Sequence, residues 1–249
     1  MTSFGKDYYE RAYGLDDMRR FNMHWWSVRF YALIARRLLR ERGGRRVLEV
    51  GCAHGYTLAR LEREFETVGF DISEYAIERS KTIAPGSATY VAAMGEELPP
   101  EIEKGRFDLI LAKYVLEHLP DPAAALRQIA RLLAPGGVLL FSVPEMRSPS
   151  RAKRGDAWYA FQDETHVSLL EAAEWLALTM AAGLELENTF SDGVWDMPWI
   201  RGVPALFQYP LFCLPTIVSV LLARPMIRAG RGENLIVVAS KPGRAGDSP

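Results

Sequence analysis

The sequence has little cysteine and almost no net charge. Cys52 and Cys213 are its only cysteines, they stand in apolar or glycine-turn surroundings, and neither shows metal-ligand spacing. Neither a disulfide framework nor a zinc site is therefore expected, and a reducing, cytoplasmic compartment fits. The formal net charge of -1 gives no global basic field, so nucleic acid is not expected as a partner.

Long uninterrupted apolar runs are also missing. The stretch MTSFGKDYYERAYG lacks the apolar core of a secretory signal, so none is expected. Residues 206–223, LFQYPLFCLPTIVSVLLA, carry no charge, but Pro210 and Pro215 interrupt them and their length barely reaches a bilayer span. A transmembrane helix is therefore not expected.

Charges of opposite sign are separated along the chain. Residues 1–46 hold 11 Lys and Arg against 5 Asp and Glu, residues 47–198 hold 13 against 24, and residues 199–249 hold 6 against 2. Two interpretations stay open: a docking face for an anionic substrate or membrane, or solvated Arg-rich helices.

Strand and helix patterns alternate through the middle of the chain. Apolar runs at 46–50, 67–72, 88–93, 107–113 and 134–144 predict strands, and helical patterns separate them. This alternation predicts parallel strands with right-handed crossovers and helices on both faces. Strands near 184–190 and 234–239 complete a predicted Rossmann-like, mostly parallel seven-stranded sheet. A polar, basic loop is expected at 145–166.

The first strand ends in a glycine turn, VLEVGCAHG. Its string from Gly51 to Gly55 lacks the Gly-x-Gly-x-x-Gly spacing that a dinucleotide pyrophosphate needs. Asp71 ends the second strand, where a carboxylate binds both hydroxyls of an adenosine ribose. A ribose without a diphosphate indicates S-adenosylmethionine (SAM).

Four motifs in order then resemble the class I SAM-dependent methyltransferases of the UbiE/UbiG-like branch. They are VLEVGCAHG, VGFDIS, FDLILAKYVLEHL and the block that ends in APGGVLLFSVP, and the likeness extends over most of residues 46–190. The resemblance implies that Gly51, Cys52, Ala53 and Gly55 form the floor under the methionine part, while Glu49 holds its amino group. Since alanine resists a strongly positive φ, the turn is expected to be milder at Ala53.

The resemblance assigns the rest of the cofactor site in the same way. Asp71 would hold the ribose and Ile72 would pack on the adenine. Relatives often carry an aspartate where this chain has Met94, so Met94 and Gly95 would supply packing or backbone contacts, with Glu96 as a possible substitute.

Two further residues complete the predicted site. Lys113 would contact the cofactor through its backbone, and its side chain is a candidate for contact with an anionic substrate. Tyr9 precedes the first long helix, where relatives place a lid, and is a candidate for stacking on the cofactor. The expected organisation is an N-terminal helical lid at 1–45, a methyltransferase domain at 46–240 with an apolar insert at 199–231, and a flexible tail at 241–249.

Methyl transfer from a sulfonium needs alignment and exclusion of water, and neither a metal nor a covalent nucleophile. If the acceptor is a hydroxyl, a base is useful, and His166 follows the fifth strand on the ligand side of the sheet. A structural role, as the N-cap or loop-bracing residue of the helix expected to begin near Ser168, is an equal alternative for His166. Glu117 and His118 are interpreted as capping and packing residues, and no metal is expected.

The apolar insert leaves the acceptor and partners open. It is interpreted as a lid or hydrophobic acceptor pocket, as an interfacial membrane anchor flanked by Arg224, Arg228 and Arg231, or as a helical pair on the sheet or at a homodimer interface. We therefore predict O-methylation of a small-molecule, lipid-like or glycan-linked acceptor, with Trp195 near it. The rivals are a catalytically degenerate binding subunit and a nicotinamide-dependent oxidoreductase.

Overall fold

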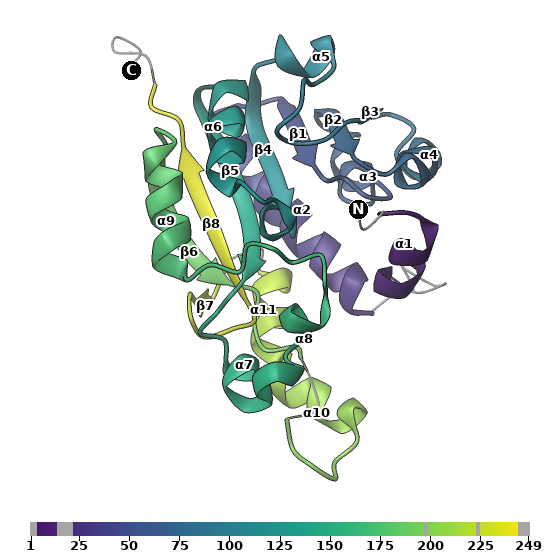
Figure 1. Cartoon of the computed structure of the whole chain (residues 1–249), viewed down its shortest axis with the longest axis vertical. Coiled ribbons are helices and arrows are strands. Elements are labelled where there is room, and N and C mark those ends of the chain that lie inside the picture. The colour runs from purple at the N-terminus through teal and green to yellow at the C-terminus, as the bar shows by residue number, and fades with distance from the viewer. Residues whose placement is uncertain (1–3, 14–21, 197–198, 223–224, 244–249) are drawn as a thin grey trace.

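The computed structural model describes residues 4–13, 22–196, 199–222 and 225–243. Parts of the predicted lid and tail, together with Arg224, lie outside these residues. One sheet organises the described chain, with the strand order β3-β2-β1-β4-β5-β8-β6-β7 (Figure 1). It has eight strands where the sequence predicts seven.

The first five strands are parallel, as the strand and helix alternation predicts. β1, β2, β4 and β5 are buried along most of their length, whereas β3 lies at the edge of the sheet and is partly exposed. Their bounds are β1 Arg46–Val50, β2 Glu66–Asp71, β3 Ala88–Val91, β4 Phe107–Lys113 and β5 Leu133–Pro144. In the neighbour order, β1 lies between β2 and β4, so the order of connection reverses beside β1.

The remaining strands are joined through antiparallel pairs. β8 (Asn234–Ser240) pairs antiparallel with both β5 and β6 (Glu185–Ser191). β6 therefore runs in the direction of the parallel strands and ends at the same edge of the sheet. The extra strand is β7 (Ile227–Arg228), which pairs with the end of β6. With only 2 residues, this strand is too short to leave an alternating pattern in the sequence.

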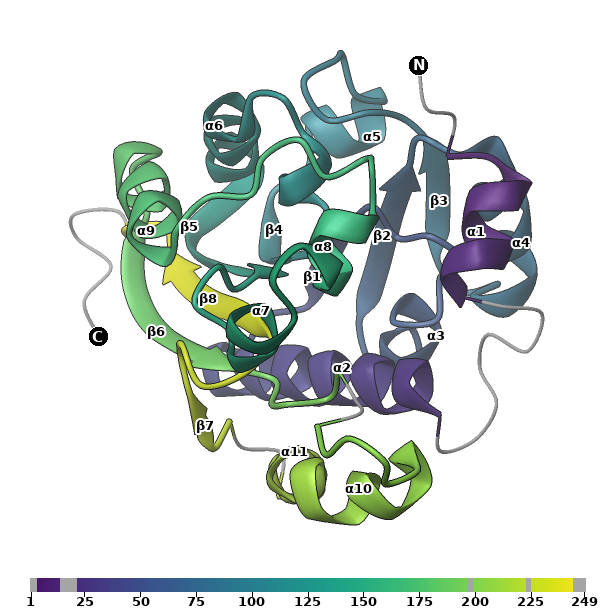
Figure 2. The same ribbon diagram turned by 60° about the horizontal axis from the view of Figure 1, so that its bottom comes forward.

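Helices cover both faces of the sheet. α2 (Met23–Arg42) lies across one face and packs Phe30, Ile34 and Leu39 against Leu109 and Leu111 of β4 (Figure 2). α6 (Pro122–Leu132) and α9 (Ala172–Ala181) cover the other face. There the alternate residues of the same strand, such as Ile110, join the second core cluster.

Shorter helices complete the parallel half. α1 (Lys6–Tyr13) lies near α4 (Glu74–Ile83), and Ser73 caps α4, because its Oγ accepts from the Ala76 amide at 3.3 Å. The other elements are α3 (Leu58–Leu61), α5 (Pro100–Glu103) and the 3-10 turn η1 (Leu116–His118).

The prediction of a loop at 145–166 is wrong. The segment contains α7 (Pro149–Arg154), the 3-10 turn η2 (Gly155–Ala157) and α8 (Tyr159–Gln162). Ser148 caps α7 and Pro149 begins it, which is a favourable start for a helix. Trp158 is fully buried and anchors the segment.

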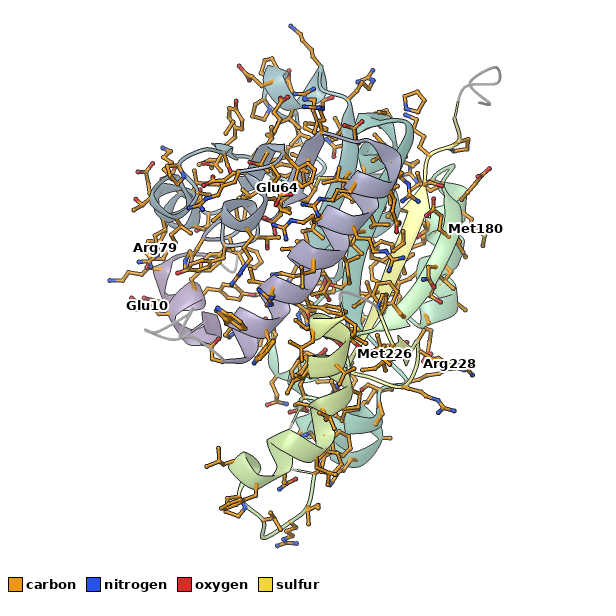
Figure 3. The ribbon with its side chains drawn as sticks, turned by 180° about the vertical axis from the view of Figure 1, so that it is seen from behind. Glu10, Glu64, Arg79, Met180, Met226 and Arg228 are labelled. Carbon is orange, nitrogen blue, oxygen red and sulfur yellow. The ribbon has the colours of Figure 1, made fainter. Side chains whose placement is uncertain are left out.

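The apolar insert forms two helices, α10 (Ala205–Phe212) and α11 (Leu214–Leu221), beside α2 (Figures 2 and 3). Val220 of α11 joins the α2 core cluster. Most other apolar side chains of the insert face solvent: Leu206, Phe207 and Leu211 are 73%, 71% and 65% exposed. None of the described helices has the length and apolar character needed to cross a bilayer.

Candidate active site

The carboxyl ends of β1, β2 and β4 surround a cavity of about 340 Å³. Ligands of open α/β sheets bind at this edge, where the order of connection reverses. All predicted cofactor residues line this cavity except two. The lining ones are Tyr9, Glu49, Gly51, Cys52, Ala53, Asp71, Ile72, Met94, Glu96 and Lys113.

The glycine turn after β1 has three residues in the left-handed region. Gly51 and Gly55 have φ values of 63° and 79°, and a Cβ at Gly51 would lie 2.4 Å from Val115 Cγ2. Ala53 has a φ of 47°, so the expectation of a milder turn at this alanine is wrong. The Ala53 amide donates to Asp71 Oδ2 at 2.9 Å, and this bond offsets the strain of the left-handed alanine.

Asp71 is buried at the end of β2 and already accepts several hydrogen bonds. Its Oδ1 accepts from the Tyr9 hydroxyl at 3.0 Å and from the Ser73 amide at 2.9 Å. Burial raises the pKa of Asp71, while these bonds act to lower it. Ile72, next in the chain, is 55% exposed and faces the cavity, as an adenine contact requires.

Glu49 supplies a second buried carboxylate at the end of β1. It is 2% exposed, and its Oε2 has no hydrogen-bond partner among the described residues. Burial raises the pKa of Glu49 to about 7, although Lys113 and Thr57 act in the opposite direction. A buried acceptor without a partner costs free energy, and the ammonium group of an amino acid would satisfy it.

Two predicted cofactor residues do not line the cavity. Gly55 lies against α4, where a Cβ would be 3.0 Å from Ser80 Cβ, so its absent side chain serves helix packing. The Gly95 amide donates to Gln128 Oε1 at 2.9 Å, and Gln128 Nε2 donates to the Glu96 carbonyl at 3.1 Å. Gln128 therefore fixes the third-strand loop and leaves Met94 and Glu96 to face the cavity.

A second cavity of about 370 Å³ adjoins the first. The two share a wall made by Tyr8, Val28, Tyr56, Lys113, Tyr114 and His118. Aromatic and apolar side chains dominate the second cavity, including Trp26, Phe30 and the predicted acceptor residue Trp195. Thr216 brings α11 to its lining, so the apolar insert borders this cavity.

His166 lines the second cavity and not the first. Its Nδ1 lies 2.7 Å from the Ala160 carbonyl, which can only accept, so Nδ1 carries a proton, and in the neutral imidazole Nε2 has the free electron pair. Nε2 lies 3.8 Å from Asp163 Oδ2. Burial acts to raise the pKa of Asp163, but hydrogen bonds from Thr165 and the nearby imidazoles lower it on balance.

Glu117 and His118 lie beside His166, and the ligand atoms of the three residues are within 4.8 Å of one another. They are the residues of the described chain that could hold a metal ion, although none is expected from the sequence. Burial raises the pKa of Glu117 to about 8 and lowers the pKa of His118 to about 4, so both are neutral near pH 7 without a cation.

Comparison with known proteins identifies the family. The family model described as "Methyltransferase domain" matches residues 20–189. The chain belongs to the methyltransferase domain family. Its fold, with the predicted glycine turn and acidic strand end at the carboxyl edge, is that of a class I methyltransferase.

Curated relatives of this methyltransferase carry the name ubiquinone biosynthesis O-methyltransferase. The relative from Xanthomonas euvesicatoria is 32% identical over 170 residues, which are 64% of this chain and 70% of the relative. The relative from Alkalilimnicola ehrlichii is 38% identical over 103 residues, which are 40% of this chain. The matches span 41% of the Alkalilimnicola protein and 62% of a third relative, from Idiomarina loihiensis.

Solved structures show the same fold at low identity. The methyltransferase NodS of Bradyrhizobium japonicum, solved with S-adenosylhomocysteine (SAH), is 18% identical with a TM-score of 0.59 and covers 95% of this chain and 97% of its own. The Haloferax volcanii methyltransferase or activator chain from a Trm112 complex has a TM-score of 0.63 at 19% identity, with 96% of both chains covered. The predicted family, fold class and SAM cofactor are confirmed, whereas the individual residue roles stay predictions.

Asp192 and Tyr114 also line the second cavity, although the sequence pattern does not single them out. Asp192 Oδ2 accepts from the Tyr114 hydroxyl and from Trp195 Nε1, each at 3.1 Å, and also from Asn234 Nδ2. Burial raises the pKa of Asp192 to about 6. Asp192 follows the last residue of β6, much as Asp71 ends β2, and an acid at a strand end can signal a ligand site. For Asp192 this signal indicates the ligand edge only when the direction of β6 in the sheet is known.

Proposed function

We propose that this methyltransferase transfers a methyl group from SAM to a hydroxyl oxygen of a small, lipid-like acceptor. The observation that supports this most is the shared wall between the two cavities, one lined by the predicted cofactor residues and the other aromatic. A methyl donor in the first and an acceptor in the second would meet at that wall.

The residues of the chain suit the two tasks of alignment and proton removal. Asp71 would hold the sugar and Glu49 the amino group, which fixes the cofactor at both ends. Bound SAM supplies a methyl group on a positively charged sulfur, which the acceptor oxygen attacks in line. The methyl group would leave the sulfur as it bonds to the acceptor oxygen, and the hydroxyl proton would pass to His166 Nε2, 3.8 Å from Asp163 Oδ2, whose charge would stabilise it.

A lipid-like acceptor is favoured by the lining and by the insert. The second cavity is mainly aromatic and apolar, and α11 reaches its wall through Thr216. The exposed apolar side chains of α10 lie on the same insert, and Arg201, Arg228 and Arg231 are exposed near it. Peripheral contact with an anionic bilayer would therefore bring the acceptor cavity close to a lipid source. The names of the curated relatives also support oxygen as the methylated atom.

The test follows labelled methyl groups. The protein is incubated with methyl-labelled SAM and organic extracts of the cells that produce it. A labelled product that is stable to mild base but releases labelled methyl iodide in hot hydriodic acid indicates a methyl ether, whereas base-labile release of labelled methanol indicates a carboxyl ester. Label that resists both treatments indicates methylation of nitrogen or carbon and would contradict the proposal. SAH binding without transfer to any extract would contradict the proposal and favour a binding subunit.

His166→Ala tests the proton acceptor. Loss of a general base lowers turnover by about 10²–10⁴-fold and leaves SAH affinity unchanged. Glu164→Ala is the matched control, since Glu164 is exposed and lines neither cavity. Turnover of His166→Ala within a few-fold of the control would assign His166 a structural role.

A further inference from the structure

Lys113, the last residue of β4, places an ammonium group at the wall between the two cavities. Among the residues that the structure describes, no other lysine and no arginine lines either cavity. Both cavities have several carboxyl groups, so this single cation is the group that distinguishes anionic from neutral ligands there.

The Lys113 ammonium has no hydrogen bond or ion pair to a described residue. Its Nζ lies 5.6 Å from the centre of the Tyr31 ring, and Glu49 acts on it electrostatically. Lys241 shows the usual solution for a lysine against the protein interior, because its Nζ donates to the Ala130 and Leu133 carbonyls at 2.7 and 2.9 Å. Lys113 has three donors and uses none of them in this way.

Binding of the cofactor would leave the Lys113 ammonium with even less compensating negative charge. A buried cation is stable only with compensating charge or acceptors, and Glu49 is the acid that acts on Lys113. In the proposed function, Glu49 binds the amino group of the cofactor. Lys113 then needs another anion, and it also lines the acceptor cavity, where its Nζ lies 5.6 Å from the centre of the Tyr31 ring.

The acids of the acceptor cavity do not supply that anion. Asp163 accepts from the Tyr8 hydroxyl at 3.3 Å and from Thr165, and it faces His166. The Asp192 carboxylate accepts from Tyr114 and Trp195. Glu117 also lines this cavity, but burial raises its pKa to about 8, so it holds its proton near pH 7. Glu49, and not these three acids, is the carboxylate whose charge acts on Lys113, so the Lys113 ammonium remains available to a ligand.

We propose that Lys113 binds an anionic oxygen of the methyl acceptor, either the ionised hydroxyl that is methylated or a carboxylate beside it. The acceptor cavity would then select molecules with an apolar body and one anionic oxygen at the end near the cofactor. This inference rests on the proposed function, because it assigns the second cavity to the acceptor.

The experiment compares three test compounds of similar size: 4-nitrophenol as its phenolate, 4-nitrobenzoate, and the neutral 4-nitroanisole. Their affinities are measured by equilibrium dialysis with and without saturating SAH. The wild-type protein is expected to bind at least one anion about tenfold more tightly than 4-nitroanisole, the size of a charge-assisted hydrogen bond. Preference for the phenolate indicates the reacting oxygen, and preference for the carboxylate indicates a neighbouring group.

Lys113→Met is expected to abolish this preference while SAH affinity stays within about twofold, and Lys113→Arg to retain it. Lys153→Met is the control, since Lys153 is exposed and packs on Trp199 outside both cavities. Circular dichroism confirms that each variant is folded.

Equal binding of all three compounds by the wild type, or a preference that survives in Lys113→Met, would overturn the inference. Loss of SAH affinity with an intact preference would also overturn it and assign Lys113 to the cofactor carboxylate. Failure of the wild type to bind SAH contradicts the proposed function instead, and the dialysis without SAH still decides the role of Lys113.

Discussion

At the scale of single residues, the cofactor end of the site is built from groups that would be unfavourable elsewhere. Ala53 takes a left-handed conformation that an amide bond to Asp71 stabilises. Glu49 keeps a carboxylate oxygen without a partner in the described chain, and Lys113 keeps a free ammonium. Local strain and unpaired polar groups of this kind are typical of binding sites, where a ligand supplies the missing contact.

The buried carboxyl group of Glu49 makes stability depend on pH. Burial raises its pKa from 4.5 to about 7, so between these values the folded protein holds a proton that the unfolded chain releases. Stability therefore falls as pH rises from about 4.5 through about 7. Glu49→Gln removes this dependence. We expect the free energy of unfolding of the variant, relative to that of wild type, to be up to about 3 kcal/mol larger at about pH 8 than at about pH 5.

Urea unfolding at both pH values measures the gain. Glu78→Gln, on the exposed face of α4, is the control and should follow wild type at both pH values. A difference between Glu49→Gln and wild type that does not change with pH would contradict the assignment.

At the scale of elements, α1 lies beside Asp71, the residue proposed to hold the ribose, because its Tyr9 hydroxyl donates to Asp71 Oδ1. A carboxylate offers about four lone-pair positions, and the Tyr9, Ser73 and Ala53 groups use three of those of Asp71. A ribose diol needs two, so the Tyr9 hydroxyl must leave when the sugar binds. This competition would make α1 a lid that opens for the cofactor.

Tyr9→Phe removes the competing hydroxyl and is expected to raise SAH affinity by roughly two- to tenfold, which calorimetry measures. Tyr8→Phe, one position earlier in α1, should leave SAH affinity unchanged because the Tyr8 hydroxyl bonds Asp163. Weaker binding by Tyr9→Phe would mean that this hydroxyl contacts the cofactor directly.

The insert is the second element whose role can be measured. Figure 3 shows α10 and α11 projecting beyond the sheet, with Met226 and Arg228 at the end of the insert and Met180 apart from it. Serine at Leu206, Phe207 and Leu211 together is expected to abolish co-sedimentation with anionic vesicles, because the exposed apolar face is lost.

Met180→Ser is the control, since Met180 is 54% exposed on α9 and should bind vesicles as wild type does. Wild-type protein that stays in the supernatant contradicts membrane contact. A dimer that dissociates on the same triple substitution would assign this face to self-association.

At the scale of the whole molecule, one sheet carries both cavities, so ligand binding is linked to global unfolding. SAH at one hundred times its dissociation constant stabilises the folded state by about 2.7 kcal/mol, which corresponds to roughly 5–10 °C in a chain of this size. We expect this shift in thermal melting with SAH and none with NADH. A shift with NADH alone would revive the oxidoreductase alternative.

The sequence by itself determined the alternation of strands and helices, the glycine turn and the acids at Glu49 and Asp71. These features are local, because a periodic apolar pattern or a turn residue determines the conformation of only a few neighbouring positions. Such patterns can therefore be recognised in the sequence without knowledge of the fold. The same locality explains why the family and the cofactor are predictable from the sequence.

Only the tertiary structure decided which of these features share a cavity. His166 lies far along the chain from His118, yet their ring centres are 4.6 Å apart. The direction of β6 brings Asp192 to the edge of the sheet where ligands bind. A hydrogen bond to Asp71 stabilises the left-handed conformation of Ala53, which alanine disfavours. Such contacts depend on sheet order and packing between distant segments, and these long-range terms leave no periodic signal in the chain.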